Sequence, residues 1–138
     1  MENYKQIINT NEFKEIENLF RNDQFDQSYE KNLELLKANE GNPFLLNILG
    51  LTLIKKGKIE NGINLLKQVC NNFPNMISAF NSLALAYREL GDYQKTLSIF
   101  NDCYKKNPNV KEVENNLAQS LLECGENEKS IKLFNQIK

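Results

Sequence analysis

The chain has 138 residues, of which 17 are basic and 18 are acidic, so its formal net charge at pH 7 is −1. This near-neutral charge gives no reason to expect nucleic acid or an anionic membrane as the main partner. The sequence contains no histidine, which excludes this residue as a catalytic base or as a metal ligand.

Other features of the composition narrow the possible chemistry further. The N-terminal stretch MENYKQIINTNEF is polar, and no apolar run is long enough to span a membrane. The three cysteines lie far apart without a C-x-x-C pair, which favours reduced thiols packed as small apolar groups. The glycines occur singly, most of them at expected helix ends, and form no phosphate-binding loop. We therefore expect a cytoplasmic chain that is not an enzyme by itself and has no cofactor or metal.

The first part of the chain predicts a short helical lead-in over 1–10, followed by helices over 11–22 and 25–38. Thr10 or Asn11 suits the start of the first of these helices, because both side chains accept hydrogen bonds from free backbone N–H groups. Apolar residues at helical spacing form the stripe that each helix buries.

Three further hairpins follow, with helices expected over 43–56, 59–72, 76–90, 93–106, 110–124 and 127–137. The central hairpin shows the pattern best, because Phe80, Leu83 and Tyr87 recur on one helix face. Gly91 then ends that helix, since glycine takes the left-handed backbone conformation easily. No stretch of the sequence reads as a strand.

The hairpins repeat, and Gly57, Gly91 and Gly125 are each 34 residues apart. The same step links residues of matching size: Leu49, Leu83 and Leu117; Gly50, Ala84 and Ala118; Ser28, Gly62, Thr96 and Ser130. A fixed period of this length indicates stacked supersecondary units. We therefore expect a single domain over 1–138, with units at about 9–42, 43–76, 77–110 and 111–138.

The first of these units departs from the pattern. Asp23 stands where the later units have the turn glycine, and Glu15 and Ile16 stand where they have leucine and a small residue. We interpret this unit as a degenerate cap whose outer face meets water.

The repeated residues resemble the tetratricopeptide repeat family. The match is fullest in the central unit, through Phe80, Leu83-Ala84, Tyr87, Gly91-Asp92-Tyr93, Phe100 and Pro108. The resemblance implies an all-α fold, an α-solenoid of antiparallel helix hairpins that winds as a right-handed superhelix with three clear units and one degenerate unit. It also implies a binding scaffold for a protein or peptide, with the first helix of each unit lining the concave side.

The candidate peptide-binding residues on that side are Asn47, Leu51, Asn81, Leu85, Arg88, Asn115 and Gln119. An asparagine amide offers one acceptor and two donors, which match the backbone groups of an extended peptide. The recurrence of Asn47, Asn81 and Asn115 therefore predicts a ladder of backbone contacts. Asparagine is abundant in this chain, so chance recurrence is the alternative. Some members of the family bind acidic C-terminal tails, but Glu112 would repel such a tail.

Three functional hypotheses follow. The favoured one is a protein-interaction scaffold or adaptor that binds a peptide or partner segment in the concave groove. The alternative is the N-terminal, substrate-presenting segment of a larger enzyme, such as a glycosyl- or sulfotransferase, which the uncapped end at Lys138 suggests. The third is a homodimer formed through Ile131, Phe134 and Ile137, which no following helix covers.

Overall fold

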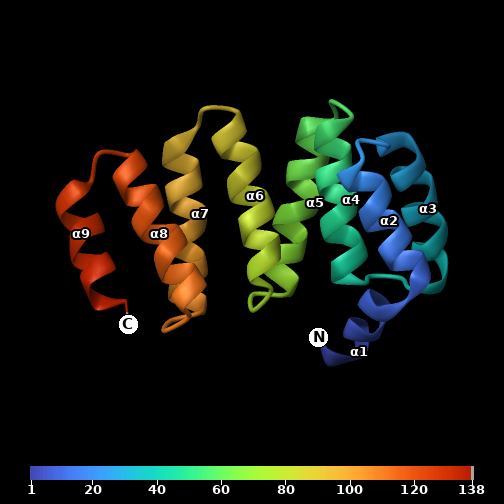
Figure 1. Cartoon of the computed structure of the whole chain (residues 1–138), viewed down its shortest axis with the longest axis horizontal. Helices are drawn as coiled ribbons and strands as arrows, with labels where there is room; N and C mark the ends of the chain where they lie inside the picture. The colour runs from blue at the N-terminus through green and yellow to red at the C-terminus, as the bar shows by residue number, and fades with distance from the viewer. Residues whose placement is uncertain (138) are drawn as a thin grey trace. The chain divides into compact units, whose positions relative to one another are not determined.

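The computed structural model describes residues 1–137, and these residues form helices and turns without a strand (Figure 1). The elements in chain order are α1 (Glu2–Lys5), the 3₁₀ helix η1 (Gln6–Asn9), α2 (Asn11–Arg21), α3 (Phe25–Ala38), α4 (Pro43–Lys55), α5 (Ile59–Asn72), α6 (Ile77–Glu89), α7 (Tyr93–Lys106), α8 (Lys111–Glu123) and α9 (Asn127–Gln136). The predicted all-α class is confirmed, and the predicted ends of α2 to α9 either agree with the structure or differ from it by one residue. Lys138, the predicted end of the last unit, lies outside the described residues.

The turn inside each hairpin depends on one residue with a positive φ. Gly57, Gly91 and Gly125 have φ angles of 87°, 78° and 79°. At Gly91 the turn is closed by two hydrogen bonds of 2.9 Å, from the Gly91 N–H to the Arg88 carbonyl and from the Asp92 N–H to the Tyr87 carbonyl. Asp23 has a φ of 60° in the first hairpin. It therefore fills the place of the turn glycine, in a conformation that aspartate tolerates better than most residues.

Side-chain caps fix the start of several helices. The Thr10 hydroxyl accepts a 3.2 Å hydrogen bond from the Phe13 N–H at the start of α2, which confirms one of the two predicted caps. Asn42 performs the same role for α4, where its Oδ1 accepts from the N–H groups of Phe44 and Leu45.

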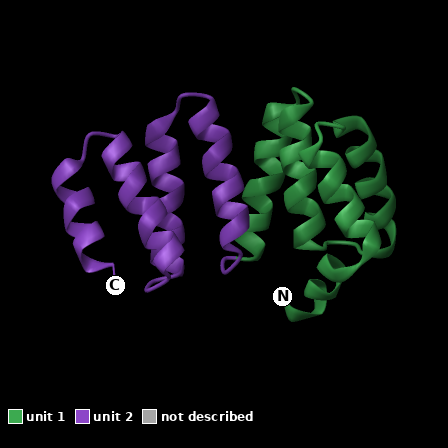
Figure 2. Ribbon diagram, in the orientation of Figure 1, with its two compact units in different colours: residues 1–73 green, residues 74–138 purple. Residues whose placement is uncertain are grey.

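The described residues form two compact units (Figure 2). Unit 1 comprises residues 1–73 and holds α1 to α5, whereas unit 2 begins at Pro74 and holds α6 to α9. The predicted single domain over 1–138 stays a prediction.

The N-terminal segment packs against the rest of unit 1. Ile7 is buried in one apolar cluster with Phe13, Ile16 and Leu45. The Tyr4 ring meets the Phe73 ring edge-on at 5.7 Å between centroids. The Asn42 amide also donates a 3.1 Å hydrogen bond to the Tyr4 carbonyl. The predicted helical lead-in is therefore an integral part of unit 1.

In unit 2, α8 packs against both α7 and α9. The buried residues shared by these helices and α6 form one core: Ala84, Phe100, Leu117, Ala118, Leu121 and Leu133. The core leucines predicted from the repeat, Leu83 and Leu117, are both buried.

Residues that recur every 34 positions are called a repeat column here. The column of Gly50, Ala84 and Ala118 in the first helices meets the column of Ser28, Gly62, Thr96 and Ser130 in the second helices where the helices of a hairpin cross. The Ser28 hydroxyl donates to the Ile16 carbonyl at 3.2 Å, Thr96 donates to Ala84 at 3.2 Å, and Ser130 donates to Ala118 at 2.7 Å. Each bond joins the second helix of a hairpin to the first.

In the hairpin of α4 and α5, the two helices cross at glycine residues, and no side-chain hydrogen bond between described residues joins them at this point. A Cβ built on Gly62 would lie 2.5 Å from the Gly50 carbonyl oxygen, and one built on Gly50 would lie 2.7 Å from Leu66 Cγ. The two backbones therefore approach each other directly, which only glycine permits.

Candidate binding face of unit 2

Five of the seven candidate residues lie in unit 2 and share one surface, which we call the α6/α8 face. It consists of Asn81, Leu85 and Arg88 on α6 and Asn115, Gln119 and Leu122 on α8. Residues spaced by four and then three positions lie on the same side of a helix, so each set forms one strip. Hydrogen bonds between side chains of α6 and α8 connect the two strips.

At one end of this face, Asn81 bridges two residues of α8. Its Nδ2 donates to Glu112 Oε1 at 2.9 Å, and its Oδ1 accepts from Asn116 Nδ2 at 3.0 Å. Both ends of the amide are thus engaged within the chain. Asn115, the other ladder residue of unit 2, is exposed. The Asn115 amide is therefore more accessible to solvent than that of Asn81, which is half-buried and already makes two hydrogen bonds.

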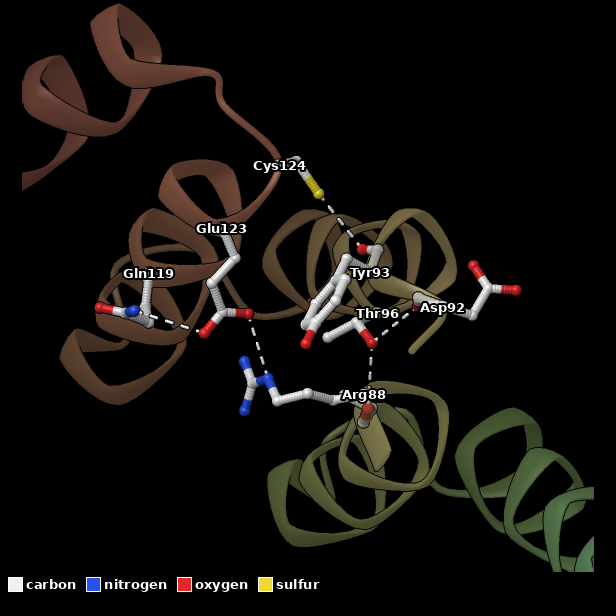
Figure 3. Close-up of polar contacts among 8 residues, drawn as sticks. Arg88, Asp92, Tyr93, Thr96, Gln119, Glu123 and Cys124 are labelled. Carbon is white, nitrogen blue, oxygen red and sulfur yellow. Dashed lines mark hydrogen bonds and ion pairs between the residues drawn. The ribbon is translucent and has the colours of Figure 1, made fainter. Parts of the chain in front are cut away.

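At the other end, Glu123 joins two of the candidate residues (Figure 3). Arg88 Nε donates to Glu123 Oε2 at 3.1 Å, and Gln119 Nε2 donates to Glu123 Oε1 at 3.3 Å. The Arg88 guanidinium also lies 5.9 Å from the centroid of the Phe100 ring. Arg88 is therefore held in place before any partner binds.

Two leucines on this face remain open to solvent. Leu85 is 44% exposed and Leu122 is 47% exposed, although most large apolar side chains of α6 and α8 are buried. Contact with an apolar group of a partner would remove part of this surface from water, which is favourable at about 25 cal/mol per Å². The face thus combines fixed polar groups with exposed apolar ones.

The two candidate residues in unit 1 have different surroundings. Asn47 is half-buried, and its Oδ1 is buried without a hydrogen-bond partner among the described residues. Leu51 is half-buried as well. One period before Asn47, the same column holds Phe13, which is 5% exposed and belongs to the core. The structure does not bring these residues into an open strip like that of unit 2.

Sequence reasoning missed the α8 partners of the candidate residues. Glu112, Asn116 and Glu123 hold Asn81, Arg88 and Gln119, and Leu122 adds the second exposed leucine. A signal was available, because Asn81–Asn116 and Arg88–Glu123 are both separated by 35 residues, one more than the period. Complementary side chains at this offset mark contacts between successive first helices.

The cysteines of unit 2 show no sign of reactivity. Burial raises the pKa of the Cys103 thiol to about 11. Burial also raises the pKa of Cys124, with a further contribution from the charges of Glu123 and Glu126, and its Sγ donates to the Tyr93 carbonyl at 3.3 Å (Figure 3). A raised pKa lowers the thiolate fraction at neutral pH, and thiolate is the reactive form.

Residues 1–137 provide neither a cluster of metal-ligand side chains nor a helix that could span a membrane. They contain no group of three or more histidine, cysteine or acidic side chains placed to hold a metal ion. No helix within this range has the length and apolar character needed to cross a membrane. Of the apolar residues predicted for self-association, Ile131 and Phe134 lie on α9 and are 59% and 41% exposed, whereas Ile137 follows the end of α9 and is half-buried.

Sequential helix hairpins with a 34-residue period define an α-helical repeat protein of the tetratricopeptide class. The family model described as "Psidin, N-terminal TPR repeats region" matches residues 13–133, so the chain belongs to this family. Such a repeat region is typically a protein-interaction module. No curated protein sequence matches the chain.

Solved structures agree with this fold. TTC0263, a thermophilic TPR protein of Thermus thermophilus, has a TM-score of 0.69 and 20% identity over 92% of this chain and 71% of its own. MamA AMB-1 has a TM-score of 0.60 and 22% identity over 87% of this chain and 72% of its own. Naa15, in a structure of Naa15/Naa10 bound to HypK-THB, has a TM-score of 0.74 and 15% identity over 89% of this chain and 18% of its own.

Proposed function

We propose that this chain is a non-enzymatic interaction scaffold that binds an extended segment of a partner protein on the α6/α8 face. The observation that carries the proposal is the exposure of Leu85 and Leu122 beside polar groups that the chain already holds in position. Pre-positioned side chains lose less conformational freedom when a partner binds. Asn115 supplies an exposed amide, and one hydrogen bond to a partner backbone contributes about 1 kcal/mol net.

The test is a selection of random twelve-residue peptides displayed on phage. The full chain would be compared with a Leu85→Ser/Leu122→Ser variant, and circular dichroism would confirm that the variant folds. We expect the wild type to enrich peptides that the variant does not retain. The control is Leu90→Ser, because Leu90 is 53% exposed but follows the end of α6, about 180° around the helix axis from Asn81. Enrichment that survives the double variant, or is lost equally in the control, would refute binding on this face.

A second candidate function is the substrate-presenting segment of a larger enzyme, such as a glycosyl- or sulfotransferase. Its support is that the matching family model describes an N-terminal region and that the likeness to Naa15 covers 18% of that chain. Sequencing the transcript beyond the codon for Lys138 tests it. A catalytic domain encoded there would favour this candidate, and an immediate stop codon would remove it.

Self-association through Ile131, Phe134 and Ile137 remains a separate proposal, supported by the exposure of the first two side chains. Light scattering over a range of concentrations tests it. A monomer mass that does not change with concentration would exclude the dimer, and an Ile131→Ser variant that stays monomeric beside a dimeric wild type would support it.

A further inference from the structure

The groups that join α6 to α8 carry an uneven charge. Two carboxylates, Glu112 and Glu123, lie on the side of α8 that contacts α6, as their bonds to Asn81 and Arg88 show. Arg88 is the cation among these four residues, and it pairs with Glu123 at 3.1 Å. The other carboxylate, Glu112, accepts a hydrogen bond from a neutral amide and has no ion pair within residues 1–137.

The neighbouring lysine does not change this charge at the contact between the helices. Lys111 directly precedes Glu112, so the two side chains leave α8 about 100° apart around its axis. Glu112 also accepts its hydrogen bond with one oxygen, Oε1, so its carboxylate retains acceptor capacity. A carboxylate without a cation, next to exposed apolar surface, favours a partner that supplies both a positive charge and an apolar side chain.

We propose that the segment bound by this face is basic, with a lysine or arginine side chain that docks on Glu112 and apolar side chains that contact Leu85 and Leu122. This inference rests on the proposed function of the α6/α8 face. An acidic segment would meet Glu112 directly, and the charge of Arg88, the cation on this face, is already paired with Glu123.

Helix geometry sets the expected spacing. Asn81, which binds Glu112, lies one turn from Leu85, or about 6 Å along α6. Leu122 lies ten residues beyond Glu112, or about 15 Å along α8. Because an extended chain advances about 3.3 Å per residue, the cation and the apolar residues of the partner should be about two to five residues apart.

The test uses the same random twelve-residue library on the full chain and on two single variants. Glu112→Gln removes the proposed docking charge and keeps the hydrogen-bond acceptor for Asn81. Lys111→Gln is the matched control, since it removes the opposite charge one residue away. We expect the wild type and Lys111→Gln to enrich peptides with lysine or arginine two to five residues from an apolar residue, and Glu112→Gln to lose the preference for the cation.

Titration of one enriched peptide, labelled with fluorescein, gives the size of the effect. We expect Glu112→Gln to weaken binding about two- to fivefold, the range of one partly exposed ion pair, and added salt to reduce the difference between wild type and variant. An unchanged cation preference in Glu112→Gln would overturn the basic-partner inference. Enrichment of acidic or uncharged peptides would overturn it as well. If Leu85→Ser/Leu122→Ser abolishes that enrichment, the proposed function of the α6/α8 face would still be supported. The absence of any enrichment would overturn both.

Discussion

One repeat column, the positions of Phe13, Asn47, Asn81 and Asn115, has very different surroundings in α2 of unit 1 and in unit 2. In α2 of unit 1 the column holds Phe13, which is buried with Ile7 of the N-terminal segment. In α6 and α8 of unit 2 it holds Asn81 and Asn115, which lie on a face with two exposed leucines. The column therefore belongs to the core in α2, whereas Asn47 and Asn81 are half-buried and Asn115 is exposed. A repeat fixes where a residue lies in a hairpin, but the contacts around it decide whether the residue stabilises or binds.

The largest expected effect on stability comes from replacing Phe13, the buried member of this column, and it can be compared with the effect of replacing Asn81. Phe13→Ala should lower the free energy of unfolding by about 3–5 kcal/mol, because it leaves a cavity in a buried cluster. Asn81→Ala should lower it by about 1 kcal/mol, since the hydrogen bonds it loses are partly exposed. Urea unfolding followed by circular dichroism measures both values. Equal losses would show that the column has the same role in the two units.

The next effect concerns the helix crossing in unit 1. Gly62→Ala should lower stability by about 1–2 kcal/mol, because the clash of its Cβ with the Gly50 carbonyl outweighs the better helix propensity of alanine. Gly62→Ser carries the same Cβ and adds the hydroxyl found at this position in the other hairpins. We expect it to be less harmful than Gly62→Ala in the same urea experiment. A stabilised Gly62→Ala protein would contradict the close approach of the two backbones.

A smaller effect tests the equivalent crossing in unit 2. Thr96→Val should lower stability by about 1 kcal/mol, because it keeps the side-chain shape but loses the bond to the Ala84 carbonyl. Thr52→Val is the matched control. Thr52 is equally buried, but its hydroxyl donates at 2.7 Å to Ile48 within its own helix. If both variants lose the same stability, the bond between helices has no special role.

The smallest effect is expected from the ion pair on the α6/α8 face. A double-mutant cycle with Arg88→Gln and Glu123→Gln should give a coupling of about 0.2–1 kcal/mol that decreases with salt, because the pair is partly exposed. Thermal melts at low and high salt measure it. A coupling well above this range would mean that the pair stabilises unit 2 rather than mainly orienting Arg88.

Much of the fold could be predicted from the sequence, because the helix stripes, turn residues and period all depend on local chemistry. Asp23 in the turn and Thr10 as a cap follow from the same rules. The surroundings of the candidate binding residues were harder to predict, because they depend on side chains one period away. A single-helix pattern does not reveal that Asn81 is held by Glu112 and Asn116, or that Asn47 is half-buried.

The hydroxyls at the helix crossings also determine which parts of this protein are interchangeable. α3, α7 and α9 each present a serine or threonine to a carbonyl of the preceding helix, at Ser28, Thr96 and Ser130. These three helices therefore contact the preceding helix in the same way. We expect that exchanging one of them for another would keep the hydrogen bond between the two helices. α5 differs, because Gly62 meets Gly50 backbone to backbone. A helix with a side chain at the position of Gly62 would place its Cβ against the Gly50 carbonyl, so we expect α5 to be exchangeable only together with α4.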